Sequence, residues 1–245
     1  MKPQAASATL GSAILFSITE PVYRVIDTVV HIAYIACMDL RWRTTYAELT
    51  PAELGEVAGV TPDLQRVWRK RGHLPPLKDA RAHFDVFLAC EVMLLQALAL
   101  RGIPPGEGAS VAKKYAHLII FAALITAEGS CEVLGPVEAV RGFAHAYAAD
   151  TKIIAQLAKT TIEYVPPYLV ILDDQPPALS PTLPDEEGHH VAETGAFINL
   201  IALGLRLASR FGRPVVRVDV SVGDPGHKQK QAPTVRRLLP HPKSY

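Results

Sequence analysis

Cysteine is scarce in this chain of 245 residues. Cys37, Cys90 and Cys131 lie far apart, and none stands in a CxxC or Cys/His spacing that would hold a metal. An odd, scattered set argues against a disulfide framework and favours a reducing, cytoplasmic environment. We therefore expect the cysteines to be small buried apolar side chains, and we expect no metal and no other cofactor.

Net charge and long apolar runs are also lacking. The formal charge is +1, so a surface that binds nucleic acid would have to be a local concentration of basic residues. The apolar stretch at residues 13–38 is interrupted by charged residues and a proline, and its clean part, residues 28–38, is shorter than the ~20 residues that cross a bilayer. The sequence thus predicts no membrane segment. The stretch is expected to be a buried or dimer-forming helix, or a leader that precedes a natural start at Met38.

Common catalytic motifs are missing as well. The sequence has no phosphate-binding glycine loop, no nucleophile elbow and no HExxH. One alternative stays open: His189, His190 and Glu193 could join Asp173 and Asp174 in the site of a metal-dependent hydrolase. The acidic, proline-rich surroundings favour a solvated loop instead, so the chain is not expected to be an enzyme.

Four regions follow from the distribution of apolar residues and proline. Residues 1–43 form an apolar N-terminal arm, and residues 44–108 a compact unit of short helices. Residues 109–222 form an oligomerisation or effector domain, and residues 223–245 a basic tail without structure.

Helical spacing dominates the third region. Helices are predicted at residues 111–126, 137–164 and 195–211, and strands at residues 168–172 and 214–221. The two strands suggest a small α/β element around the last helix. That helix is apolar around most of its circumference. We therefore expect part of its surface to pack against a second subunit, which predicts a homodimer.

The most informative segment begins at Thr50. Thr50 and Glu53 form a capping-box pattern with Pro51 at the first helical position, and Thr61 with Pro62 repeats the cap and the proline. Gly59 stands between them, where the chain must turn. Two capped helices with a short glycine turn predict a helix-turn-helix.

The second helix, residues 62–71, has the residue types that read DNA. We expect Leu64, Val67 and Trp68 to form its buried stripe, since they lie three and four residues apart. Its outward face would then carry the side chains that contact base edges and nearby phosphates, namely Gln65, Arg66, Arg69 and Lys70. From residue 66 to residue 81 the sequence has six basic residues against one aspartate, a local excess of about +5 that suits phosphate binding.

The segment resembles the MerR superfamily. The family's pattern appears as Gly-Val-Thr-Pro at residues 59–62, Arg-Val-Trp at 66–68, Gly-His-Leu at 72–74 and Arg-Gly-Ile-Pro at 101–104. Pro75, Arg81 and Phe84 stand where the family has its wing. The resemblance covers roughly residues 49–116, and it implies a winged helix-turn-helix that binds double-stranded DNA.

Some features depart from the family. The wing lacks the usual glycine-tyrosine-arginine hairpin, and Gln65 stands where an apolar residue is preferred. The latter implies a slightly rotated helix, or a subgroup in which Leu64 makes the core contact. No metal-sensing cysteine pattern follows, so metal sensing is not implied. Phage excisionases and small terminase subunits use similar winged helices, so a DNA-packaging or architectural role remains an alternative.

The expected fold class is mainly α: a MerR-like winged helix-turn-helix, then an α-rich domain with a small two-strand α/β element. The expected function is sequence-specific transcriptional regulation by a homodimer in the cytoplasm, with RNA polymerase open as a further partner. The predicted DNA-binding residues are Thr61, Gln65, Arg66, Arg69, Lys70, Arg71, Lys78 and Arg81.

Overall fold

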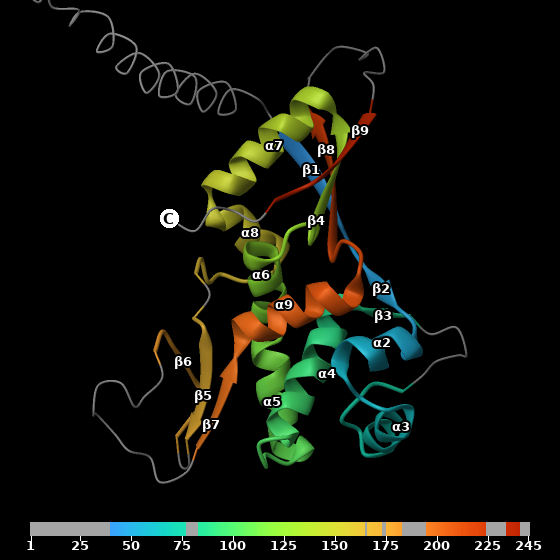
Figure 1. Ribbon diagram of the computed structural model, residues 1–245, viewed down its shortest axis with the longest axis vertical. Helices are drawn as coiled ribbons and strands as arrows, with labels where there is room; N and C mark the ends of the chain where they lie inside the picture. Colours follow the sequence, from blue (N-terminus) through green and yellow to red (C-terminus); the bar gives the residue numbers. More distant parts are fainter. Residues whose placement is uncertain are drawn as a thin grey trace, which may run out of the picture.

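The computed structural model describes residues 40–76, 83–164, 166–172, 175–182, 195–223 and 234–240. These residues form eight helices and nine strands in three sheets, and about 49% of them are helical and 25% lie in strands. The expectation of a mainly α protein is therefore wrong, and the fold is mixed α and β (Figure 1).

The largest sheet has four strands in the order β1, β8, β4, β9. β1 (Leu40–Tyr46) runs antiparallel to β8 (Val216–Val222), which is parallel to β4 (Cys131–Pro136). β9 (Thr234–Leu238) closes the other edge, antiparallel to β4. The helix α7 (Val137–Ala149) packs across one face of this sheet, and α8 (Thr151–Leu157) follows it (Figure 1).

Alternation along β8 decides which face of the sheet is covered. Val216, Val218 and Val220 are buried on the side of α7, whereas Arg217 and Asp219 are exposed on the opposite side. This confirms the half-buried strand predicted at residues 214–221. The opposite face, which is the open face among the described residues, carries charged side chains.

A layer of helices joins this sheet to the N-terminal unit. α6 (His117–Thr126) packs on α9 (Leu200–Phe211), and α4 (Val86–Ala99) contacts both. α5 (Pro105–Tyr115) precedes α6 and makes an angle of 51° with it, so the single helix predicted at residues 111–126 is divided. In the described part of the chain, no single helix is long and apolar enough to cross a membrane, and α5 with α6 meets that test only as a bent pair.

The third sheet has the order β6 (Ala178–Ser180), β5 (Tyr168–Leu172), β7 (Gly195–Asn199). β5 confirms the strand predicted there. β7 corrects the helix predicted at residues 195–211: its first five residues pair with β5, with Ile198 opposite Leu169. The helix begins only after Asn199, whose side chain accepts a hydrogen bond from the backbone N–H of Ala202.

Three further expectations need correction. The two predicted strands do not form one α/β element, because β5 and β8 lie in different sheets. The helix predicted at residues 137–164 ends at Ala149, and α8 starts anew from an Asp150 cap. The tail is not entirely without structure, since β9 pairs with β4 and places Leu239 in the core.

Other predictions fall outside the described residues. They concern Cys37, the apolar segment at residues 13–38, and the hydrolase residues Asp173, Asp174, His189, His190 and Glu193.

Candidate nucleic-acid interface

Two short helices at the lower right of Figure 1 form the predicted helix-turn-helix. α2 (Pro51–Ala58) begins at Thr50, where the capping box with Glu53 is complete in both directions. Gly59 ends it with a φ of 72°, which a residue with a Cβ rarely adopts. α3 (Pro62–Lys70) begins at Thr61, whose hydroxyl accepts from the N–H of Leu64 at 3.3 Å. Both predicted caps and the turn are confirmed.

The orientation of α3 differs from the expectation. Trp68 is buried, as predicted, with 2% of its surface exposed. Gln65 is equally buried at 2%, while Val67 is 41% exposed. The buried stripe of α3 therefore passes through Gln65 and Trp68, and Val67 belongs to the outer face. The prediction that Gln65 points outward is wrong.

Gln65 is buried because its amide group has partners inside the motif. Its Nε2 donates to the carbonyl oxygens of Pro51 at 3.2 Å and Val60 at 3.3 Å. Gly55 makes room for it: a Cβ there would lie 2.8 Å from that nitrogen. A glutamine can occupy this position since both of its amide hydrogens are used. It ties the start of α2 to the turn before α3.

Arg69 is held in the same network. Its Nη2 donates to Oε1 of Gln65 at 3.0 Å, and its guanidinium lies over the ring of Phe84, 5.4 Å from the centroid. Desolvation lowers the pKa of Arg69, although an arginine stays charged under such conditions. The side chain therefore holds α3 against the strand that follows it. Its role is to position the helix and not to contact DNA directly.

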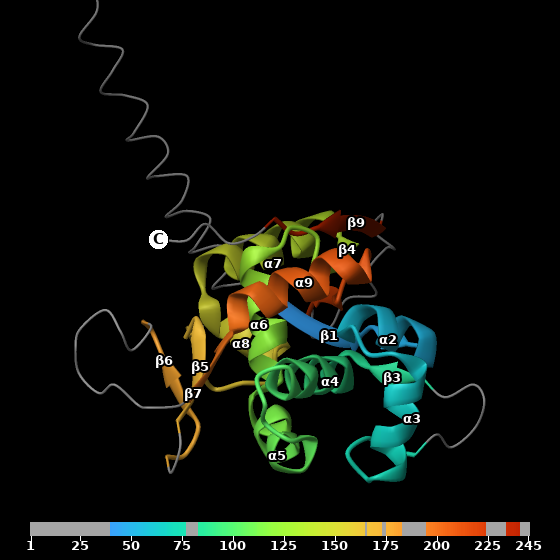
Figure 2. The same cartoon turned by 60° about the horizontal axis from the view of Figure 1, so that its bottom comes forward.

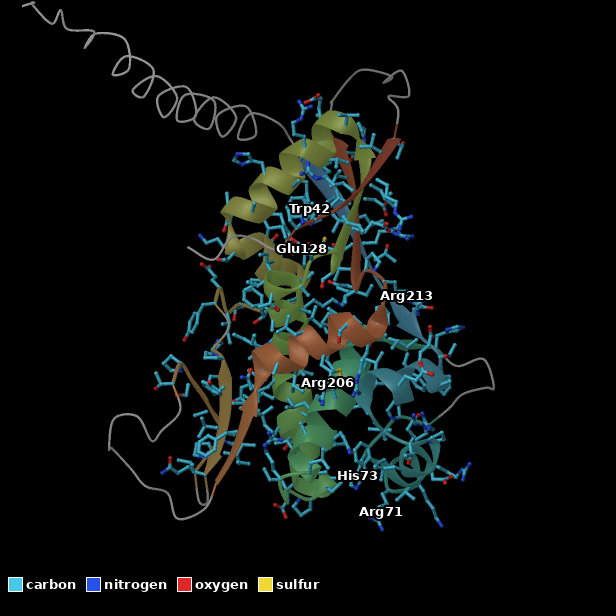
Figure 3. All side chains as sticks on the ribbon, viewed as in Figure 1. Trp42, Arg71, His73, Glu128, Arg206 and Arg213 are labelled. Atoms are coloured by element: carbon cyan, nitrogen blue, oxygen red, sulfur yellow. The ribbon has the colours of Figure 1, made fainter. Side chains whose placement is uncertain are left out.

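The outer face of α3 carries the remaining basic residues. Arg66, Lys70 and Arg71 are exposed. Arg66 pairs with Asp63 at 2.9 Å, but the two side chains are 79% and 85% exposed, so the pair is weak and easily opened. Figure 3 shows Arg71 directed away from the body at the lower end of the molecule. Val67 lies among these charges, so the prediction that it belongs to the buried stripe is wrong.

A small sheet flanks the two helices. β2 (Glu48–Leu49) precedes α2 and pairs antiparallel with β3 (Phe84–Asp85), which lies directly before α4. The segment that joins α3 to β3 includes residues 77–82, so Lys78 and Arg81 lie outside the described residues. The helices and this sheet form one corner of the molecule (Figure 2).

A shallow cavity of about 390 Å³ opens between the first turns of α2 and α3. Pro51 and Ala52 line it from α2, and Pro62 and Arg66 from α3. Arg66 adds a positive charge to this corner, and Asp63 in the first turn of α3 offsets it.

Two arginines from the far end of the chain hold the unit in place. Arg210 of α9 donates to the carbonyl oxygens of Glu56 and Val57 at the end of α2, at 3.2 and 3.3 Å. Arg213 donates to the carbonyl oxygen of Glu48 at 2.7 Å and to Glu53 Oε1 at 3.0 Å. The orientation of α2 and α3 thus depends on α9 and the segment after it.

The predicted site residues divide into three groups, one of which, Lys78 and Arg81, lies outside the described residues. Thr61, Arg66, Lys70 and Arg71 lie on the exposed side of the α2–α3 unit, with the Thr61 hydroxyl used as a cap. Gln65 and Arg69 turn inward. Sequence reasoning missed that Val67 is exposed and that Asp63 pairs with Arg66. The spacing of three residues between Asp63 and Arg66 was a visible signal, whereas the exposure of Val67 depends on the rotation of α3.

The described residues contain no group of three or more histidine, cysteine, aspartate or glutamate side chains placed to hold a metal ion. No protein-family model matches the chain, and no curated protein or solved structure matches it significantly.

Proposed function

We propose that this protein binds double-stranded DNA through the outer face of α3 and regulates transcription, in the manner of a MerR-like winged helix-turn-helix. The observation that carries the proposal is the arrangement of α3: a helix fixed by Trp68, Gln65 and Arg69 on one side that presents Arg66, Lys70 and Arg71 on the other. A rigid helix with an exposed basic face suits the major groove, which is wide enough to admit it.

The contacts would divide by type. Arg66 and Lys70 lie four residues apart on one side of α3, and an arginine there can pair bidentately with guanine. Val67, exposed on the same outer face, can contact a thymine methyl group. Arg71, exposed directly after α3, would bind a phosphate and set the position of the helix.

The small β2–β3 sheet supports the comparison with winged helices, because it lies beside α3, where the guanidinium of Arg69 stands over the ring of Phe84 in β3. We further propose a homodimer, because two half-sites one DNA turn apart multiply a modest single-site affinity.

The test is duplex binding by the purified full chain, measured by fluorescence anisotropy at several salt concentrations. Affinity should fall steeply with salt, because phosphate binding releases counterions. Arg66→Ala and Lys70→Ala should each weaken binding to the preferred site, by about 1–3 kcal/mol if they contact bases.

Arg141→Ala is the matched control. Arg141 is an exposed helical arginine paired with Glu138 three residues earlier, as Arg66 is with Asp63. It lies on α7, away from α3 in the chain, and its loss should leave the affinity unchanged. Equal DNA affinity of wild type and the Arg66→Ala, Lys70→Ala double variant would remove α3 from the proposal.

A further inference from the structure

A second cavity of about 390 Å³ lies at the open face of the four-stranded sheet, where β1 and β8 approach β2. Its volume is in the range of small-molecule sites, about 300–1,000 Å³. The charged residues that line it are Glu48, Glu132, Arg213, Arg217 and Arg236. Three arginines against two glutamates leave a net charge of +1 in the lining. None of these residues belongs to the exposed face of α3.

Glu132 is the structural centre of the cavity. It lies on β4 and is completely buried, and it stands opposite Arg217 in the register of β4 with β8. Arg217 Nε donates to Glu132 Oε2 at 2.6 Å, and Arg236 Nε of β9 pairs with Oε1. A buried carboxylate requires charged partners of this kind. One glutamate thus fixes two arginines from two different strands.

The two arginines use only one edge of each guanidinium for Glu132. Both pair through Nε, and their side chains remain 53% and 65% exposed. Within the part of the chain that the structure describes, the terminal nitrogens of Arg217 and Arg236 donate to no other group. A guanidinium has five N–H donors in a fixed fork, so each arginine keeps its outer pair of donors for a ligand.

We propose that this cavity binds the phosphate group of a phosphorylated small molecule, held by Arg217 and Arg236. Arginine forks match phosphate oxygens in geometry and charge, and the buried carboxylate orients them in advance. The single negative charge of Glu132 cannot neutralise both guanidinium groups, and a phosphate monoester supplies at least the one negative charge that is missing. The proposal does not depend on DNA binding by α3.

The experiment is calorimetric titration of the full chain with inorganic phosphate and with adenosine monophosphate. We expect saturable binding at one site. The Arg217→Lys, Arg236→Lys double variant keeps positive partners for Glu132, so it should fold, but it loses the forks, and its phosphate affinity should fall about tenfold. Arg141→Lys, on the exposed surface of α7, should bind phosphate as the wild type does.

Three results would overturn the proposal. The first is no saturable phosphate binding by the wild type. The second is equal affinity in a double variant whose circular dichroism and melting temperature match the wild type. The third is a wild type that binds neither small probe but binds a short DNA duplex more tightly than the double variant does. The two arginines would then contact the nucleic-acid backbone. The Arg66→Ala, Lys70→Ala variant separates the two proposals, because it should keep its phosphate affinity.

Discussion

The side-chain amide of Gln65 donates to the carbonyl oxygen of Val60 at 3.3 Å, inside the turn between α2 and α3. The bond places a polar side chain at a position where an apolar one was expected. It also fixes the rotation of α3, and hence the residues that this helix can offer to a partner.

Replacing Gln65 tests this role. Gln65→Ala removes the donor to Pro51 and Val60 and the acceptor for Arg69, so it should lower the free energy of unfolding by about 1–3 kcal/mol, the cost of unpaired buried polar groups. Urea unfolding measures the change. Lys70→Ala, on the exposed side of the same helix, should be nearly neutral. Unchanged stability of Gln65→Ala, with an altered base preference, would return Gln65 to the DNA-contacting face.

The neighbouring pair Val67 and Trp68 makes a second test of the helix rotation. Trp68→Ala should destabilise the protein by about 3–5 kcal/mol, because it empties a buried position. Val67→Ala should change stability by no more than about 0.5 kcal/mol, as expected of a surface substitution. Equal losses for the two variants in denaturant unfolding would show that α3 is rotated from the orientation described.

The bonds from Arg210 to α2 predict a local effect. Arg210→Ala should increase amide hydrogen exchange in α2 and α3, because the last carbonyl groups of α2 lose their tie to α9. Exchange in the β1–β8 pair, in the four-stranded sheet, is the internal control and should stay as in the wild type. Uniformly faster exchange throughout the chain would mean that Arg210 supports the whole fold and not this attachment.

Burial raises the pKa of the Cys131 thiol to about 12, with a smaller contribution from the charge of Glu132. In the unfolded chain the thiol ionises near its ordinary value, about 8.5, so the folded state binds the proton more tightly. This contribution to stability is complete below that value and is lost as the pH rises toward 12. The unfolding free energy of the wild type should therefore decline with alkaline pH.

Cys131→Ala isolates the effect. Its stability at neutral pH is lower, but its decline with pH should be shallower than that of the wild type by up to about 1.4 kcal/mol per pH unit. Urea unfolding across the alkaline range measures both slopes. Parallel declines would show that the Cys131 thiol ionises in the folded protein as readily as in the unfolded chain.

The proposed dimer is best tested at an exposed position of α9. Leu200 and Leu207 of α9 are completely buried within the chain, so a glutamate at either position would disrupt the fold. Leu205 is 45% exposed, and Leu205→Glu should lower the mass found by light scattering if α9 joins two copies. A concentration-independent mass near that of one 26.6 kDa chain in the wild type would contradict the dimer.

Local signals were enough to predict part of the fold. Thr50, Glu53 and Thr61 act on backbone groups three residues away, so their capping roles can be inferred from spacing alone. The alternation of β8 is equally local. Gln65 is different, since its burial depends on carbonyl oxygens up to 14 residues distant that only the folded turn brings close.

The boundary at Asn199 shows the same limit. Residues 195–199 have the apolar content of the helix that follows them, but β5 offers them a strand partner nearly 30 residues away in the chain. Glu132 and Arg236 are more than a hundred positions apart, so no spacing rule could have predicted the second cavity. Pairings over such distances are set by the sheet and not by the local sequence.

The attachment of α2 by Arg210 and Arg213 also has a consequence for synthesis. The bonded groups are separated by 153 to 165 positions, so the ribosome completes α2 and α3 well before their anchors exist. At roughly 5–20 residues per second the delay is on the order of ten to thirty seconds. During that interval the nascent α2 exposes the apolar surface that α9 later covers. A message truncated before α9 would leave that surface open to chaperones and proteases.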